Sequence, residues 1–149
     1  MTPPAPRHRS AAKTDYLLDE QIGFLLRVAM QRHTSIFMSH IVKGLTQTQF
    51  AALAKLREVG PCSQNQLGRL IYLDAATAKG VVDRLEKRAL ITARPDAHDR
   101  RRRAIALTEK GRAVADAAVK VARQITRATL TPLTAAEQRA VVRLLKKLG

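Results

Sequence analysis

The 149-residue chain contains no tryptophan, and aromatic residues make up only 3% of it. Because the hydrophobic fraction is still 46%, the core has to be built from leucine, valine, isoleucine and alanine, which is typical of helical domains. There is a single cysteine, Cys62, so an internal disulfide is excluded and no metal-ligand spacing of cysteines exists. A redox-sensing thiol is one reading of Cys62, but beside a predicted helix start we interpret it as a small packing residue.

Long apolar runs are also missing. No segment approaches the roughly 18 apolar residues that a membrane-spanning helix needs, and the N-terminus lacks the apolar block of a signal peptide. We therefore expect a cytoplasmic protein. The chain shows no paired carboxylates on one helix face, no convincing order of serine, histidine and aspartate, and no glycine-rich phosphate loop. These absences disfavour an enzyme, and no cofactor is expected.

Acidic residues are scarce. The chain has 12 aspartates and glutamates against 27 lysines and arginines, which gives a formal net charge of +15. Such an excess of positive charge predicts an acidic polymer as partner, with nucleic acid first among the candidates. Residues 1–13 combine three prolines with Arg7, Arg9 and Lys13 and show no hydrophobic periodicity, so we predict a disordered basic arm. Contact of this arm with a minor groove is the alternative to a solvated tail.

Both ends of the remaining chain are predicted to be long amphipathic helices. Apolar residues recur at helical spacing from Asp19 to Ile41, again from Leu107 to Pro132, and once more after Thr134. Since these stripes exceed what the segment between them can cover, we expect them to pair with a second subunit. His33 and His40 lie on the first stripe, but no third ligand stands nearby at helical spacing, so packing or interface histidines are favoured over a metal site.

The middle of the chain reads as two short helices, a third helix and a hairpin. Thr46 with Gln49, and Ser63 with Gln66, form the capping-box pattern that starts a helix. A further helix starts at Asp74, and its buried stripe is predicted to consist of Ala78, Val81, Val82 and Leu85.

Two short strands are predicted after this helix, at Leu90–Arg94 and Arg103–Leu107, with turn-forming residues between them. Helices joined by a tight turn and followed by a basic hairpin are typical of a winged helix-turn-helix. The fold class is therefore mainly α with a small β element (α+β).

Four motifs in order resemble the MarR family of bacterial transcription regulators, from about Leu17 to Leu148. They are Leu45-Thr46-x-x-Gln49, the run from Val82 to Arg88, the wing residues Arg94, Asp96, Asp99, Arg100 and Arg101, and Leu107-Thr108-x-x-Gly111. The resemblance implies a homodimer held by the first and last helices, with two recognition helices in successive major grooves of a palindromic operator. It also implies a pocket between the dimer helices and the winged domain where a small molecule alters operator affinity.

This resemblance sets the expected domain organisation. Residues 14–149 form one MarR-like subunit after the arm at 1–13. Within it, residues 46–107 are the winged helix-turn-helix DNA-binding domain, and residues 14–43 plus 108–149 are dimerisation helices.

Double-stranded DNA is the expected partner of the middle segment. On the exposed face of the predicted recognition helix, Lys79 is placed to reach guanine acceptors or a phosphate, while Arg84 is placed farther along for a phosphate. By resemblance, Asp99 orients an arginine, most simply Arg101, into the minor groove, and strand alternation sends Arg101 and Arg103 to the same side. The complete set of candidate DNA-binding residues is Gln64, Asn65, Ala76, Thr77, Lys79, Gly80, Arg84, Asp99, Arg100, Arg101 and Arg103.

One wing residue departs from the family pattern. His98 stands where the family usually has an arginine, so one cation of the wing is weaker or dependent on pH, and neighbouring arginines are expected to compensate.

The expected effector is a small anion. Arginines beside an apolar cleft suit carboxylate or phosphate because a guanidinium binds these groups in a forked geometry. The stretch from Leu18 to His33 resembles the first helix of MarR regulators that control aromatic-acid catabolism, some of which respond to coenzyme A thioesters. An aromatic acid or its CoA thioester is therefore the expected ligand class. Candidate ligand-binding residues are Arg27, Gln31, Arg32, His33, Phe50, Leu53 and Arg57, with ordinary surface and interface positions as the alternative for the arginines.

The leading hypothesis from sequence is thus a homodimeric repressor released from its operator by a small anionic ligand. The competing hypothesis is an architectural DNA-binding protein that has no effector.

Overall fold

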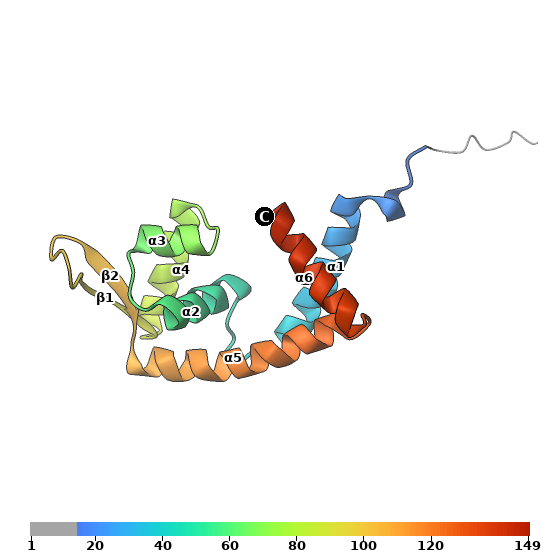
Figure 1. The fold of residues 1–149 in the computed structure, drawn as a ribbon. Coiled ribbons are helices and arrows are strands. Elements are labelled where there is room, and N and C mark those ends of the chain that lie inside the picture. The colour runs from blue at the N-terminus through green and yellow to red at the C-terminus, as the bar shows by residue number, and fades with distance from the viewer. Residues whose placement is uncertain (1–14) are drawn as a thin grey trace, which may run out of the picture.

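The computed structural model describes residues 15–149, so the predicted basic arm at 1–13 lies outside the described residues. The predicted order of helices and hairpin is confirmed (Figure 1). The helix expected from Asp19 starts later, because a 3-10 turn precedes it. The elements are η1 (Leu18–Glu20), α1 (Ile22–His40), α2 (Gln47–Val59), α3 (Gln64–Leu70), α4 (Ala75–Lys87), β1 (Ile91–Pro95), β2 (Arg103–Leu107), α5 (Glu109–Leu130) and α6 (Ala135–Leu148).

The helix starts follow the capping chemistry of the sequence, with one difference. At α2 the Thr46 hydroxyl accepts the Gln49 N–H at 3.1 Å, and the Gln49 side chain accepts the Thr46 N–H at 3.2 Å, so the predicted capping box is complete. At α3 the Ser63 hydroxyl accepts the Gln66 N–H at 3.1 Å, but the return bond is missing from this cap. The second predicted capping box is therefore only half formed.

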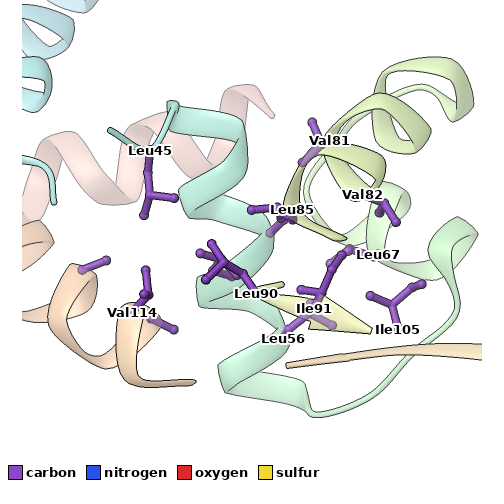
Figure 2. Packing of buried hydrophobic residues seen from close by; sticks show 14 of the residues in the cluster. Leu45, Leu56, Leu67, Val81, Val82, Leu85, Leu90, Ile91, Ile105 and Val114 are labelled. Atoms are coloured by element: carbon purple, nitrogen blue, oxygen red, sulfur yellow. The ribbon is translucent and has the colours of Figure 1, made fainter. Parts of the chain in front are cut away.

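The core lies where α2, α3, α4 and the wing meet the start of α5 (Figure 2). The stripe predicted for α4 is buried as expected, and Leu85 is fully enclosed. Val114, Ala115 and Ala118 of α5 belong to the same cluster. The first turns of α5 are therefore part of the winged-helix core, although the sequence assigned everything after residue 107 to the dimerisation helices.

The wing is a two-stranded antiparallel sheet in which Ile91 pairs with Leu107 and Pro95 with Arg103. Pro95 thus belongs to the first strand, one residue beyond its predicted end. Cys62 adds a third short pairing, since its backbone exchanges hydrogen bonds with Ile105 at 3.1 and 2.7 Å. The cysteine side chain is buried, and this burial raises the pKa of its thiol.

The end of α4 is fastened to the start of α5. Thr108 donates from its N–H to the Leu90 carbonyl at 3.1 Å and from its hydroxyl to the Ala89 carbonyl at 2.6 Å. One turn later Gly111 packs so closely that a Cβ on it would lie 1.8 Å from the Leu90 carbonyl oxygen. This contact explains why the motif after the wing contains a glycine.

The far end of α5 is joined to α1. Arg32 donates to the carbonyls of Ala128, at 2.9 Å, and of Thr129, while His33 Nδ1 lies 2.9 Å from the Thr129 hydroxyl. With 22 residues, α5 is about 33 Å long, enough to connect the winged core to the α1 end of the molecule (Figure 1). Among residues 15–149, none of the helices has both the length and the apolar character that crossing a membrane requires.

Gly111→Ala tests the fastening of α5. Because the added methyl group meets backbone rather than a movable side chain, we expect the free energy of unfolding to fall by about 3 kcal/mol. Denaturant unfolding followed by circular dichroism measures this change.

Gly23→Ala is the matched control. Gly23 is helical and has no atom within 4 Å of a built Cβ, so alanine there is expected to leave stability unchanged or to raise it by up to about 1 kcal/mol. Equal stability of the two variants would contradict the account of Gly111.

Candidate nucleic-acid interface

Asp74 starts α4, the helix that the sequence analysis predicts to be the recognition helix. Its carboxylate accepts the Thr77 N–H at 2.8 Å and the Thr77 hydroxyl at 3.0 Å. The bond from the Thr77 N–H, followed by that from its hydroxyl, holds the pKa of Asp74 below its ordinary value. Thr77 thus uses its hydroxyl hydrogen within the cap, and only its oxygen remains to accept a hydrogen bond from DNA.

The exposed face of α4 is small at its start and charged farther on. Ala76, Thr77, Lys79 and Arg84 are exposed, while Gly80 is half-buried. Gly80 is covered by its own helix, because the Arg84 guanidinium lies 3.4 Å from the position of a Cβ at residue 80. A methyl group at residue 80 would only touch this flexible side chain, so the glycine chiefly keeps this part of the helix surface low.

Lys79 is paired in the free protein. Its ammonium lies 2.8 Å from the Asp83 carboxylate one turn later. The hydrogen bond to Asp83 and the Coulomb attraction of the same carboxylate raise the pKa of Lys79.

A polar cleft of about 560 Å³ separates the start of α3 from the base of the wing. The backbone pairing of Cys62 with Ile105 fixes this geometry, since Ser63 directly follows the first residue and Arg103 lies two positions before the second. Three guanidinium-bearing residues border the cleft, which gives it the charge and hydrogen-bond donors that suit a phosphate. Its lining residues are Ser63, Gln64, Asn65, Arg69, Arg102 and Arg103.

The cleft contains two arginines that the sequence analysis did not assign to DNA, Arg69 and Arg102. Arg69 stands four residues after Asn65 and therefore projects from the same side of α3. The spacing of one helical turn from Asn65 is the sequence signal that identifies Arg69. Arg102 was expected only to compensate for His98, although strand alternation placed it on the same side as Arg100, which was a candidate.

The structure corrects that alternation. Strand β2 starts at Arg103, so the three arginines before it lie in the turn and have no strand alternation. The carboxylate of Asp99 accepts the backbone N–H of Arg101 at 3.0 Å, and the arginine side chain within ion-pair distance of it is Arg102, at 3.9 Å. Asp99 therefore shapes the turn and faces Arg102, whereas the sequence analysis had it orient the Arg101 side chain.

Asp96 stabilises the same turn. Its carboxylate accepts the N–H groups of His98 and Asp99 at 2.8 and 3.1 Å, and these bonds, with that from His98 first, lower its pKa. The wing tip presents Arg100, Arg101 and the His98 side chain as exposed groups.

The candidate effector residues do not form one group. Arg32 and His33 contact the end of α5 at residues 128 and 129, whereas Arg57 pairs with Asp116 at 2.6 Å. Residues 116 and 129 are about 20 Å apart along a helix, so Arg57 and Arg32 lie at different ends of α5. Leu53 is wholly enclosed in the winged-helix core.

An aromatic cluster does form where α1 meets α2. The rings of His33 and Phe37 are 6.5 Å apart, and those of Phe37 and Phe50 are 6.1 Å apart. Arg27 and Gln31 are exposed one turn apart on α1, and the Arg27 guanidinium lies 5.3 Å from the Phe24 ring centre. Phe37 was not among the sequence candidates, although its spacing of four residues from His33 places it on the same helix face.

Comparison with known proteins identifies the family. The family model described as "MarR family" matches residues 45–102. The HTH-type transcriptional repressor NicR of Pseudomonas putida is 43% identical over 136 residues, which cover 91% of this chain and 86% of that protein. The chain belongs to the MarR family. As a MarR protein it is a DNA-binding transcription regulator and not an enzyme.

Two solved structures of regulators resemble this MarR chain over most of its length. A probable transcriptional regulator from Pseudomonas aeruginosa is 51% identical with a TM-score of 0.85, covering 89% of this chain and 100% of that one. BpsR of Bordetella bronchiseptica, whose DNA binding is regulated by 6-hydroxynicotinic acid, is 42% identical with a TM-score of 0.83, covering 89% of this chain and 96% of that one. The winged helix-turn-helix fold predicted from the sequence is thereby confirmed.

Arg69→Ala tests whether the cleft holds a phosphate. A lost phosphate contact weakens binding to all DNA sequences about equally and makes the slope of log affinity against log salt shallower by about 1. Fluorescence anisotropy at several salt concentrations measures both quantities.

Arg112→Ala removes the same charge from the first turn of α5, which lies across the winged-helix core from α3 and α4 in Figure 1. We expect this control to keep the parent slope. A loss of affinity confined to one DNA sequence in the Arg69 variant would instead indicate base contact and count against the phosphate assignment.

Proposed function

We propose that the protein is a homodimeric repressor that binds a palindromic operator and leaves it when a small anionic aromatic ligand binds. The observation that carries the proposal is the combination of a thin, exposed helix start at α4 with an arginine-lined cleft beside it. In this arrangement α4 enters the major groove, where Ala76, Thr77 and Lys79 meet base edges. The cleft holds a backbone phosphate, and the exposed wing arginines contact the adjacent minor groove.

The apolar surface of α6 supports a dimer. No residue of α6 is buried in the described chain, and Leu144, Leu145 and Leu148 are all about half exposed or more. On α1, Ile22, Leu25 and Leu26 are similarly uncovered. Several large apolar side chains exposed on each of two helices favour a partner surface, and a second copy of the chain provides a matching apolar face.

A groove on α6 fits the same partner. It has a volume of about 710 Å³, an apolar floor that includes Leu130 and Val142, and a basic rim that includes Arg139 and Arg143. The Gln138 side chain at the start of α6 donates to the carbonyls of Leu130 and Leu133, each at 3.1 Å, so α6 is tied to the end of α5.

The effector site is assigned to the aromatic cluster of His33, Phe37 and Phe50. The cluster places the partly buried rings of His33 and Phe50 beside the buried Phe37, with Arg32 nearby as a source of positive charge. The regulation of BpsR by 6-hydroxynicotinic acid makes hydroxylated aromatic acids the first ligands to test. A ligand here pushes on the contacts that hold the end of α5, and so changes the placement of the two DNA-binding units.

The effector proposal predicts thermal stabilisation by an aromatic acid. In a panel of 6-hydroxynicotinate, nicotinate, benzoate and benzoyl-CoA, we expect at least one compound at 100 times its Kd to stabilise the fold by about 2.7 kcal/mol. The same compound is expected to lower operator affinity in an anisotropy assay.

His33→Ala is expected to abolish the thermal shift, whereas His40→Ala is the control. His40 is on the same helix but is exposed and bonds only the carbonyl of Ile36. A panel without any stabilising compound, or a shift that survives in the His33 variant, would contradict the assignment of the site.

A further inference from the structure

The exposed face of α4 has a carboxylate near its centre. Asp83 lies three residues after Gly80, four after Lys79 and seven after Ala76, so all four share one side of the helix. The other charged groups around it are Arg84, Lys87 and Glu86. An acidic side chain on a surface that meets phosphate is electrostatically unfavourable, so Asp83 needs a compensating role.

Its contact in the structure is with Lys79. The ammonium and carboxylate are 2.8 Å apart, and the two side chains remain 67% and 47% exposed. An exposed pair one turn apart on a helix contributes little to stability, because water screens it and both side chains lose rotational freedom. Stability alone therefore does not account for Asp83.

The pair constrains where Lys79 points. The ammonium donates to the Asp83 carboxylate at 2.8 Å, and this bond holds the lysine side chain along the line from residue 79 to residue 83 on the α4 face. When a helix lies in the major groove, the base edges face the middle of its exposed surface, and the phosphates line the walls of the groove. Without Asp83, the long lysine side chain is free to swing to either wall.

We propose that Asp83 is a positioning residue that holds Lys79 toward base edges and away from phosphates, so that discrimination between operator and other DNA increases. The inference rests on the proposed function, which places α4 in the major groove. Its direct consequence is that Asp83 lowers affinity for non-operator DNA by acting through Lys79.

The test compares the parent with Asp83→Asn, Lys79→Ala and the double variant. Affinity is measured by anisotropy on the duplex protected in a footprint and on a scrambled duplex of equal length, over a salt series. Asp83→Asn is expected to bind scrambled DNA several-fold more tightly, with a salt slope steeper by about 0.9 for one added phosphate contact. The ratio of operator to scrambled affinity falls, and in the Lys79→Ala background the asparagine causes no further change in that ratio.

Glu58→Gln is the matched control. It removes the same charge from an ion pair of the same kind, Lys55 with Glu58 at 3.1 Å, on α2. We expect it to leave the affinity ratio and the salt slope as in the parent. Thermal melting of every variant checks that the fold is retained.

Three results would overturn the inference: unchanged binding in Asp83→Asn, an equal change in the Lys79→Ala background, or a loss confined to the operator. The second result indicates direct repulsion of phosphate, and the third indicates that Asp83 itself accepts a hydrogen bond from a base. If Lys79→Ala binds both duplexes as the parent does, the placement of α4 in the groove fails and the inference with it. If Lys79→Ala loses operator affinity while Asp83→Asn changes nothing, only the inference fails.

Discussion

The bonding between the end of the recognition helix and the start of α5 is the constraint on which the rest of the structure depends. Ala89 and Leu90 give their carbonyls to Thr108, and the Arg88 carbonyl accepts from the Lys110 side chain at 3.2 Å. Gly111 allows the two backbones to touch at this point. The end of α4 and the start of α5 are therefore joined by backbone hydrogen bonds and by the buried Leu90.

Through this constraint α5 joins the winged core to the outer helices, which we propose to form the dimer interface. The winged core is attached to one end of α5, and α1 grips the other end through Arg32 and His33. In the proposed dimer, a tilt of α5 about its α1 end displaces α4 by an amount that grows with the length of the helix. A ligand in the aromatic cluster of His33, Phe37 and Phe50 acts at the α1 end of α5. The proposed effector site therefore needs no contact with DNA.

Local patterns in the sequence predicted most of the fold. Helical spacing identified the buried stripe of α4, and the Thr46 capping box formed as expected. Long-range contacts were harder to predict. The pairing of Cys62 with Ile105, which builds the arginine cleft, joins residues 43 positions apart and leaves no periodic signal. The membership of Val114 in the winged core was missed for the same reason.

The candidate DNA-binding residues could be predicted from the sequence on the regular helix α4, but less well in the turn between β1 and β2. The exposed positions of α4 follow from its buried stripe, but Arg100 to Arg102 lie outside the strand, so strand alternation does not place them. The candidate effector residues come from two predicted helices, and the sequence does not show where those helices cross. Consequently Arg57 proved to pair with Asp116, far from Arg32, and Leu53 proved to be a core residue.

The central claim is that apolar outer helices hold two copies of the α4 unit at a fixed spacing. A footprint of the parent protein on its own promoter DNA, compared with a Leu144→Glu and Leu145→Glu double variant, tests it most directly. The account predicts that the parent protects one two-fold symmetric site with half-sites about one DNA turn apart. The double variant is predicted to sediment as a monomer and to lose this protection. Uniform coverage by the parent, or the same footprint from a monomeric variant, would contradict the account.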